Sequence, residues 1–287
     1  MELNLAGKTV CITGGSRGIG LATACAYAAE QAKVIICARD QGRLNEAVET
    51  IRNATGVTVD AVQTDVTKRE DIDRLVEHLT REYGQLDILV NNAGTGIYKP
   101  FADVTDDDLL AGMSINFFAQ FRLTQRALDL LKKGGSSVVI NVSGRTALRG
   151  SFPPGSSCTG PAKAAEVRFS IDLATELAEH GVRVNCVVPG VVKSEDRFKL
   201  WEGEAISKDL DADTTANVRQ ELESVSVPVG QRWGSPEDVA DVIVFLSSAR
   251  AAYVNGAALT VDGGPHNKSY VTQLYGHKSS GLTAATN

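Results

Sequence analysis

The sequence lacks most features that mark a secreted, membrane or nucleic-acid-binding protein. It has no apolar run long enough to span a bilayer, and its N-terminus has no basic segment followed by a hydrophobic core. Its net charge of -6 argues against the basic face that nucleic-acid binding needs. We therefore expect a cytoplasmic protein that binds neither nucleic acid nor membrane.

Cysteine is scarce, and its five copies are not spaced as CxxC pairs. That absence argues against a zinc site, and we expect no metal. Cys158 lies in a loop considered below. The other four lie in apolar strand-like or helical runs, which indicates buried thiols: Cys11, Cys25, Cys37 and Cys186.

What the sequence does contain is a regular alternation of short apolar runs with helical patterns, without internal repeats. Continuous apolar runs such as 34–36 and 88–90 indicate strands that are buried on both faces. The alternation predicts a doubly wound α/β fold, a seven-stranded parallel sheet of the Rossmann type, in a single domain over residues 1–264. The predicted strands are 9–13, 33–38, 58–63, 86–91, 137–142, 182–188 and 257–261, and the predicted helices are 18–30, 41–54, 69–83, 106–132, 160–180 and 236–248.

Two segments depart from this alternation. Residues 193–228 are more polar and carry no strand signal, which predicts a substrate lid over the carboxyl ends of the strands. Residues 265–287 are rich in Ser, Thr, Asn and Gly and form a C-terminal tail, either disordered or packed on a partner subunit.

The strongest functional signal is a glycine-rich turn between the first predicted strand and the first helix. Glycine lets the backbone approach a pyrophosphate closely, and the N–H groups that open the following helix bind anions. An ordinary strand–helix turn is the alternative, but the strand before it and the helix after it favour a nucleotide site. The residues expected there are Gly14, Ser16, Arg17, Gly18, Ile19 and Gly20.

The end of the second predicted strand indicates which nucleotide is bound. Arg39 stands where a protein that uses NAD usually places an acidic residue for the ribose hydroxyls. Together with Arg17, it offers two guanidinium groups to a 2′-phosphate. The alternative is a pair of solvated arginines, with Asp40 competing for Arg39. We interpret the pattern as a preference for NADP(H).

The spacing Gly14-x-x-x-Gly18-x-Gly20, together with Asn91-Asn92-Ala93-Gly94, resembles the short-chain dehydrogenase/reductase family over about residues 5–264. The resemblance implies an oxidoreductase that acts on a small molecule and assembles as a homodimer or homotetramer through its long helices. It also implies further cofactor contacts, with Asp65 and Val66 at the adenine, Asn92, Ala93 and Gly94 at the adenosine ribose, and Pro189, Gly190, Val192 and Ser194 at the nicotinamide carboxamide. A helix cap is the alternative role of Asp65, and it is compatible with the first.

The resemblance implies four catalytic side chains, Asn, Ser, Tyr and Lys, of which two are present. Asn116 and Lys163 match the family's Asn and Lys, and Lys163 would also hold the nicotinamide ribose. Thr159 stands where the tyrosine belongs, four residues before Lys163, and Gly144 takes the place of the serine. A threonine hydroxyl is shorter in reach and far less acidic than a phenol. We therefore expect this site to lack the acid that protonates a carbonyl oxygen.

Several residues between the missing serine and the helix are candidate substrate contacts: Ser143, Arg145, Ser157, Cys158 and Thr159. The hydroxyl of Ser143, or that of Ser156 or Ser157 through a lengthened loop, is a candidate to enter the site, but none of them is an acid near neutral pH. Cys158 offers a thiol, with a small packed thiol as the alternative. Arg145 offers a guanidinium to a substrate anion, with a solvated loop arginine as the alternative.

These observations predict an NADP(H)-dependent reductase with a non-standard site, in the biosynthesis of a natural product. Its acceptor is expected to be pre-activated, an iminium or a conjugated system, because reduction of a cation needs no acid on oxygen. One alternative is a Diels–Alder-type cyclase, alone or combined with reduction, since the loop at 153–155 weakly resembles that of alkaloid-pathway members of the family. A sensor that binds NADP(H) without turnover is the other.

Overall fold

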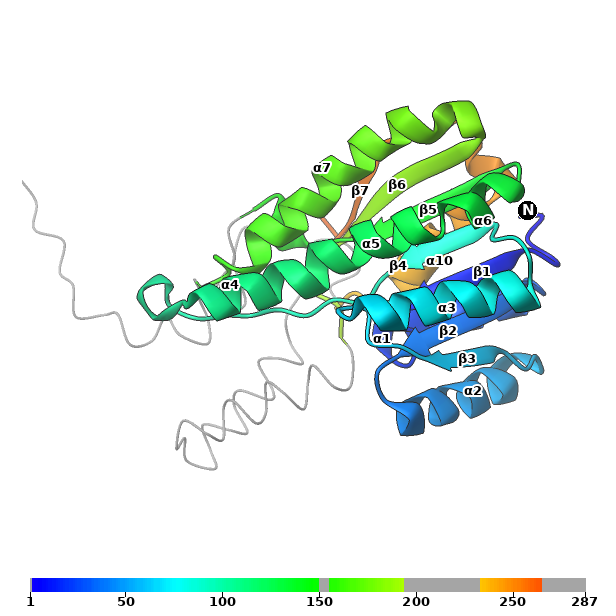
Figure 1. Cartoon of the computed structure of the whole chain (residues 1–287), viewed down its shortest axis with the longest axis horizontal. Helices are drawn as coiled ribbons and strands as arrows, with labels where there is room; N and C mark the ends of the chain where they lie inside the picture. The colour runs from blue at the N-terminus through cyan, green and yellow to red at the C-terminus, as the bar shows by residue number, and fades with distance from the viewer. Residues whose placement is uncertain (1, 150–154, 194–232, 265–287) are drawn as a thin grey trace, which may run out of the picture.

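The computed structural model describes residues 2–149, 155–193 and 233–264. They contain one sheet of seven parallel strands in the order β3-β2-β1-β4-β5-β6-β7 (Figure 1). The predicted tail, and the predicted lid apart from Lys193, lie outside the described residues. The strands are β1 Thr9–Thr13, β2 Lys33–Ala38, β3 Asp60–Gln63, β4 Ile88–Asn91, β5 Ser137–Val142, β6 Val182–Pro189 and β7 Ala258–Val261.

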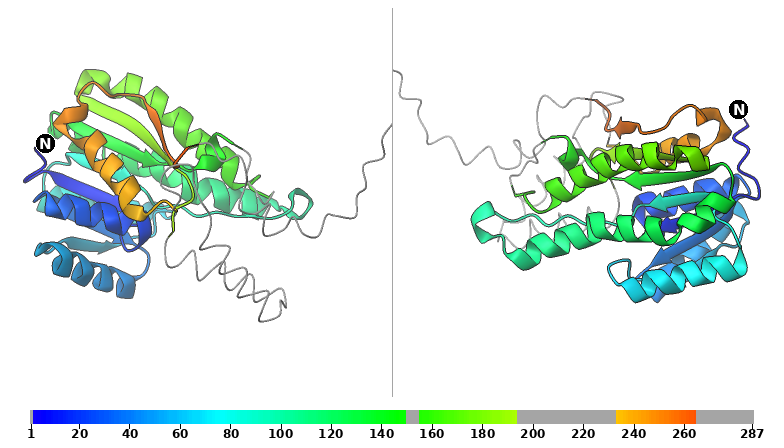
Figure 2. Two further views of the ribbon diagram at one scale, coloured as in Figure 1. Left: turned by 180° about the vertical axis from the view of Figure 1, so that it is seen from behind. Right: turned by 45° about the horizontal axis from the view of Figure 1, so that its top comes forward.

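Helices cover both faces of the sheet, which confirms the predicted fold class (Figures 1 and 2). Helices α1, α2 and α10 pack on one face, and α3, α5, α6 and α7 pack on the other. Neighbouring strand residues enter opposite cores: Ile12 and Ile36 face the first group, and Cys11 and Ile35 face the second. This two-sided burial explains the continuous apolar runs. The helices are α1 Gly18–Ala29, α2 Gln41–Thr55, α3 Arg69–Glu82, α4 Asp106–Met113, α5 Ala119–Arg126, α6 Leu128–Lys133, α7 Thr159–Leu177 and α10 Pro236–Ser247.

The strand order reverses between β1 and β4. Strand β1 pairs with β2 on one side, with Thr13 opposite Cys37, and with β4 on the other, with Ile12 opposite Val90. At such a reversal the loops that leave neighbouring strands diverge, and they leave a crevice beyond the carboxyl ends of the strands. The glycine turn follows β1 and the Asn92–Gly94 loop follows β4, so both motifs lie at this crevice.

The predicted helical stretch over 106–132 is helical along almost its whole length, but it is not one regular α-helix. The segment consists of α4, a π-helical turn at Ser114–Phe118, α5 and the short α6. The side chain of Asn116 within the π turn donates from Nδ2 to the carbonyl of Gly112 at 3.0 Å. That carbonyl, four residues back, is the acceptor that a regular helix uses for the backbone N–H of Asn116. At the end of the turn the N–H of Ala119 donates to the carbonyl of Ser114, five residues back, and such π turns often occur at functional sites.

The five cysteines are free thiols inside packed elements. Four are fully buried and Cys25 is partly buried. In the ranges that the structure describes, no helix combines the length and apolarity needed to cross a membrane.

Candidate active site

The glycine turn after β1 and the loop after β4 are hydrogen-bonded to each other. Thr13 Oγ1 accepts from the backbone N–H groups of Asn92 and Ala93, both at 2.9 Å. Asn92 Nδ2 donates back to the carbonyls of Thr13 and Gly14 at 2.9 and 3.2 Å. The two predicted motifs therefore form one connected wall of the crevice. The role of Thr13 in joining them was not foreseen from the sequence.

The glycines of the turn are required by its geometry. Gly14 and Gly18 have φ angles of +65° and +52°, and a Cβ on Gly20 would lie 2.2 Å from the carbonyl oxygen of Gly14. Helix α1 begins at Gly18, and the side chain of its N-cap residue, Arg17, does not cap it. The space in front of the first N–H groups of α1 is open only because these positions are glycines. Such a space fits the phosphates of a dinucleotide. Ser16 and Ile19 lie partly buried in the same stretch.

Arg17 and Arg39 lie exposed at the same edge of the sheet. The N–H of Gly15 donates to the carbonyl of Cys37 at 3.2 Å, which fixes the glycine turn against the end of β2. Asp40, the possible competitor for Arg39, accepts from the backbone N–H of Arg43 through Oδ1 at 2.9 Å and caps α2.

Asp65 lies between β3 and α3 but is not the cap of that helix, so the helix-cap prediction is wrong. The N-cap residue of α3 is Lys68. The carboxylate of Asp65 instead accepts from the backbone N–H and the hydroxyl of Thr67, at 3.0 and 2.7 Å. Its backbone N–H donates to Asp71 at 2.8 Å, and this bond lowers the pKa of the Asp71 carboxyl. Val66 beside it is buried.

The end of β6 carries the residues predicted for the nicotinamide side. Pro189 pairs with Val261 of β7, and the N–H of Gly190 donates to the carbonyl of Val261 at 2.9 Å. A Cβ on Gly190 would lie 2.5 Å from Cβ of Asp262, so glycine is needed for this close approach. Val192 is buried and bridges to Gly234. Ser194 lies outside the described residues.

Asn116 and Lys163, the two predicted catalytic residues, meet at Gly94. A Cβ on Gly94 would lie 2.8 Å from Asn116 Oδ1 and 3.0 Å from Lys163 Nζ. Asn116 also exchanges hydrogen bonds with the backbone of Thr95, accepting its N–H at 3.1 Å and donating to its carbonyl at 2.8 Å. Three segments far apart in the sequence thus converge just beyond β4.

Lys163 is held by a buried acidic residue that sequence reasoning missed. Its Nζ donates to Glu166 Oε1 at 3.0 Å and to the carbonyl of Val142 at 3.2 Å. Gln120 Nε2 on α5 donates to the same carboxylate oxygen at 2.7 Å. Burial raises the pKa of Glu166 to about 7, against the opposing effect of the Lys163 ammonium and the Gln120 hydrogen bond. The signal in the sequence was the i,i+3 spacing of a lysine and a glutamate on one helix.

Thr159 occupies the position expected for a tyrosine, but it is turned to a neighbouring loop. Its hydroxyl accepts from the backbone N–H of Ile97 at 2.8 Å and donates to the carbonyl of the same residue at 3.0 Å. The side chain is buried, with 3% exposure. The Thr159 hydroxyl therefore both donates and accepts a hydrogen bond within the protein.

The other serine and cysteine candidates are also engaged or packed. Ser143 Oγ donates to the main-chain carbonyl of Lys163 at 2.8 Å. Cys158 is buried, and a Cβ added to Gly112 would lie 3.3 Å from the Cβ of Cys158. This close packing supports the interpretation of Cys158 as a packed thiol. Ser157 Oγ is buried without a hydrogen-bond partner among the described residues. At the position of the family's serine, a Cβ on Gly144 would meet nothing within 4 Å.

Two exposed or partly exposed side chains lie at the rim. Arg145 is partly buried and begins a 3₁₀ turn, Arg145–Ala147, directly after Gly144. Tyr98, which the sequence analysis passed over, is 52% exposed in the loop after β4. Its ring lies against Gly96, whose Cβ would come within 3.0 Å of the phenol oxygen. In the described part of the chain the hydrogen bonds of Lys163 Nζ go to Val142 and Glu166, and not to a tyrosine.

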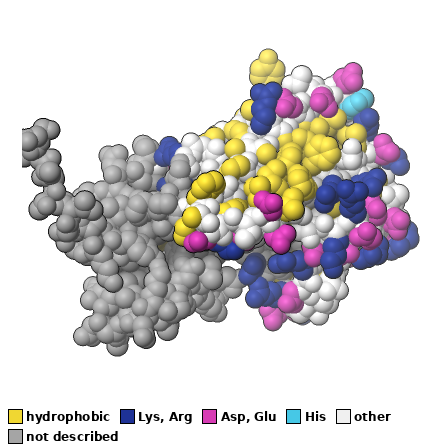
Figure 3. Space-filling view, turned by 60° about the vertical axis from the view of Figure 1, so that its left-hand side comes forward, with side chains coloured by type: hydrophobic (Ala, Val, Ile, Leu, Met, Phe, Trp, Pro, Cys, Tyr) yellow, Lys and Arg dark blue, Asp and Glu magenta, His cyan; other side chains and the backbone are white. Residues whose placement is uncertain are grey.

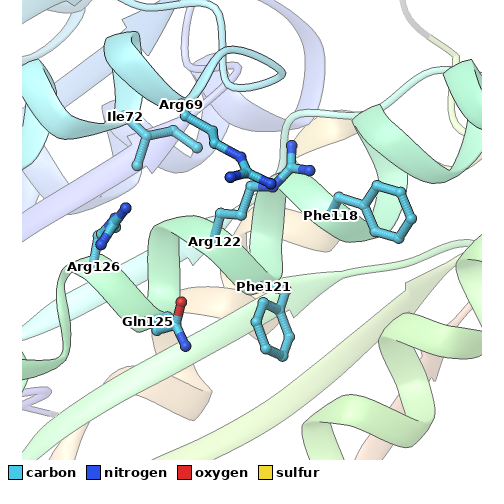
Figure 4. A pocket seen from close by; sticks show the side chains of 7 residues that line it. All are labelled: Arg69, Ile72, Phe118, Phe121, Arg122, Gln125 and Arg126. Atoms are coloured by element: carbon cyan, nitrogen blue, oxygen red, sulfur yellow. The ribbon is translucent and has the colours of Figure 1, made fainter.

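A separate pocket of about 330 Å³ lies between α3 and α5, outside the crevice (Figure 4). Two of its three arginines are engaged: Arg126 pairs with Asp73 at 3.0 Å, and the guanidinium of Arg122 lies 5.4 Å from the ring centre of Phe118. None of its lining residues belongs to the predicted site. No group of three or more His, Cys, Asp or Glu side chains suited to a metal ion occurs within residues 2–149, 155–193 and 233–264.

Comparison with known proteins agrees with this geometry. The model of the short chain dehydrogenase family matches residues 8–205. A tropinone reductase homolog from Arabidopsis thaliana is 34% identical over 262 residues, 91% of each chain. The structure of L-sorbose reductase from Gluconobacter frateurii, complexed with NADPH and L-sorbose, has a TM-score of 0.85 and 32% identity, over 94% of this chain and all of that one.

A further solved structure is also similar to this chain. It is an NADPH-bound short-chain oxidoreductase from Pseudomonas aeruginosa PAO1 that contains an atypical catalytic center. Its identity to this chain is 31% and its TM-score is 0.76, with 91% of this chain and 98% of that one covered. The chain belongs to the short-chain dehydrogenase family, whose members are oxidoreductases that use nicotinamide cofactors.

Proposed function

We propose that the protein is an NADP(H)-dependent reductase that acts on a pre-activated acceptor in the biosynthesis of a natural product. The cofactor part of the proposal is supported by the glycine cradle at the start of α1 and by the exposed Arg17 and Arg39 beside it. Two guanidinium groups suit the 2′-phosphate that distinguishes NADP(H) from NAD(H). The structural relatives from G. frateurii and P. aeruginosa both contain NADPH.

In this proposal different residues bind the cofactor and position the groups around it. When bound, NADPH supplies the hydride. The first N–H groups of α1 hold the phosphates, while Asn92 keeps the loop after β4 against the glycine turn. Asn116 fixes the backbone of Thr95, and Lys163, whose ammonium lies beside Gly94, would hold the nicotinamide ribose.

One observation carries the acceptor part of the proposal: the hydroxyl of Thr159 is bound on both sides to Ile97. Gly144 adds no hydroxyl at the place of the serine. A carbonyl reduced here would become an alkoxide without a positioned acid, which normally contributes a factor of about 10² to 10⁴ in rate. An iminium ion becomes a neutral amine and needs no such acid, and a conjugated acceptor becomes a delocalised enolate.

The test is an acceptor panel followed by NADPH oxidation and product mass. We expect a cyclic iminium or a conjugated enone to be reduced at least about a hundredfold more efficiently than simple ketones, the loss that a missing acid predicts. The double variant Thr159→Tyr, Gly144→Ser, which restores the family's pair, should gain ketone reduction. Equal turnover of ketones and iminium ions by the unchanged protein would contradict the proposal.

The same assay separates the two alternatives raised by the sequence. A cyclase forms product without net NADPH oxidation, and a sensor binds NADPH and forms none. One NADPH oxidised for each reduced product identifies the reductase.

We also propose that the protein is a homodimer, or a homotetramer built from such dimers, through an aromatic face of α5 and α7. Phe169 packs on Phe117 and Phe121, with ring centres 5.7 and 5.3 Å apart, while Phe121 and Ile171 stay 42% and 39% exposed. Figure 3 shows apolar side chains gathered on one face and bordered by charged ones. Exposed apolar patches of this kind usually mark interfaces.

Sedimentation of Phe121→Asp tests the dimer, because a buried unpaired carboxylate at its centre should dissociate it. The matched control is Tyr253→Asp, which places the same charge at a fully exposed aromatic residue outside the patch. A monomeric wild-type protein would contradict this proposal and leave the proposed activity unaffected.

A further inference from the structure

Glu166 is a buried carboxyl group one helical turn beyond Lys163. Its side chain has 0% exposure, and its Oε1 accepts from Lys163 at 3.0 Å and from Gln120 at 2.7 Å. Glutamate is almost never fully buried unless it is paired, and taking a pair of charges out of water is costly. An apolar side chain of similar size would fill the same space without that cost.

The groups around Glu166 come from four elements, and the charged one is Lys163. Helix α5 presents the amide of Gln120, and the end of β5 presents the hydroxyl of Ser143. Strand β6 presents the thiol of Cys186, which stays neutral because burial raises its pKa to about 12. On α7, Ser170 donates its hydroxyl to the main-chain carbonyl of Glu166 at 2.7 Å.

The surroundings suit both protonation states of Glu166. The ionised form is held by Lys163 and Gln120 through Oε1. The other oxygen, Oε2, and the amide oxygen of Gln120 are buried without hydrogen-bond partners among the described residues. A proton on Oε2 would turn one of these acceptors into a donor. Because burial raises the pKa of Glu166 to about 7, the change of charge falls near neutral pH.

We propose that Glu166 is a specificity-determining positioning residue, which cancels the charge of Lys163 and so admits acceptors that carry a positive charge. The inference rests on the proposed function, since an iminium is the acceptor class that an unpaired ammonium would exclude. Lys163 Nζ lies 3.0 Å from where a Cβ of Gly94 would stand, and its side chain is 10% exposed. It therefore faces the crevice in which the acceptor is reduced.

The size of the effect follows from Coulomb's law. Two positive charges about 6 Å apart at an effective dielectric constant of about 20 repel strongly enough to change an equilibrium about a hundredfold. The carboxylate of Glu166, at 3.0 Å from the ammonium, removes most of that repulsion when it is ionised. When it is protonated, Lys163 is left uncompensated.

The experiment compares two acceptors of similar size across pH. One is a permanently charged N-alkyl cyclic iminium, which has no titration of its own, and the other is an uncharged conjugated enone. For wild-type protein we expect kcat/KM for the iminium to rise about tenfold from one unit below pH 7 to one unit above it, following the ionisation of Glu166. For the enone we expect no rise.

The matched variants are Glu166→Gln and Glu176→Gln, which remove one carboxylate each from α7, at a buried and an exposed position. We expect Glu166→Gln to lower kcat/KM for the iminium by ~10- to 100-fold and to flatten its pH profile. The value for the enone should stay unchanged or rise, because the uncompensated ammonium attracts the enolate that forms. Glu176→Gln should behave as wild type. A cooperative unfolding transition and unchanged NADPH affinity establish that each variant is folded.

A flat wild-type profile for the iminium, or an equal loss for both acceptors in Glu166→Gln, would overturn the inference while the reductase proposal stood. Calorimetry with a saturated quaternary ammonium analogue, on the protein–NADP⁺ complex, makes the same comparison without turnover. Binding that strengthens through pH 7 in wild type but not in Glu166→Gln supports the inference even if neither acceptor is reduced. Binding that is independent of pH overturns it.

Discussion

The hydroxyl of Thr159 donates to the carbonyl of Ile97 and accepts from the N–H of the same residue, at 3.0 and 2.8 Å. One side chain at the start of α7 thereby satisfies both backbone groups of a residue in the loop after β4. That loop carries Gly94, at which Asn116 and Lys163 meet. The Thr159 hydroxyl thus links the start of α7 to the loop after β4.

Replacing Thr159 by valine should destabilise the protein. Valine keeps the shape but removes the partner of the N–H and the carbonyl of Ile97 in a partly buried place, at a cost of up to about 1–3 kcal/mol for each group. Chemical denaturation measures this loss. Thr159→Ser keeps the hydroxyl and should lose less than about 1 kcal/mol. Equal stability of the valine and serine variants would mean that the hydrogen bonds between Thr159 and Ile97 do not stabilise the protein.

Gly94→Ala should disrupt the reaction centre without unfolding the chain. The new methyl group would lie 2.8 Å from Asn116 Oδ1 and 3.0 Å from Lys163 Nζ, so both side chains must shift. A displacement of this size costs on the order of 10²-fold in rate, and steady-state kinetics with NADPH would show it. Gly144→Ala is the stability control, because its methyl group enters open space and the backbone there is extended. Full activity of Gly94→Ala would contradict the view that the positions of Asn116 and Lys163 beside Gly94 matter for the reaction.

Arg39→Ala should weaken NADPH more than NADH. Loss of a charged hydrogen bond costs about 1.5–3 kcal/mol, which is a ~10- to 100-fold rise in Kd for NADPH. Fluorescence titration with both nucleotides measures the ratio. Arg52→Ala is the control, because this arginine is exposed on α2 and pairs with Glu49. An unchanged NADPH-to-NADH ratio in Arg39→Ala would refute the proposed recognition of the 2′-phosphate.

The stability of the protein should depend on pH through Glu166. Burial raises the pKa of this carboxyl from 4.5 to about 7, so the folded protein binds the proton more tightly than the unfolded chain. Its stabilising contribution is complete below about pH 4.5 and is lost as the pH rises through about 7. The loss amounts to roughly 3 kcal/mol.

The measurement is the free energy of unfolding across this pH range, in wild type, Glu166→Gln and Glu176→Gln. The difference in slope between wild type and Glu166→Gln is the informative quantity, since the other titrating groups are common to both. Parallel curves would mean that Glu166 titrates normally in the folded state.

The fold was predictable because strands that are buried on both faces of a sheet have continuous apolar sequences. Runs such as Val34–Ile36 have no polar face, and only a sheet covered on both sides accommodates them. The π-helical turn within 106–132 was not predictable from periodicity, because apolar spacing does not show that Ala119 donates to a carbonyl five residues back. Asp65 resembled a helix cap, but its carboxylate turns to Thr67.

The parts of the site that are formed by short sequence motifs were predictable. The parts that depend on contacts between distant residues were not. The glycine turn and the positions of Asn116 and Lys163 follow from short spacings. The partner of Thr159 is 62 residues away along the chain, and no local pattern identifies it. Glu166 follows Lys163 closely, yet a charged residue on a helix normally indicates a solvated face, and only the packing of α5 against α7 shows its burial.

The double acceptance by Thr13 has a consequence for how a ligand would be received. Because its hydroxyl ties the N–H groups of Asn92 and Ala93 to the end of β1, the two rims of the groove are already in register before anything binds. A dinucleotide that arrives there loses little affinity to ordering of the receptor. Thr13→Val, which cuts the tie and keeps the shape, would convert a rigid receptor into one that must be assembled at each encounter.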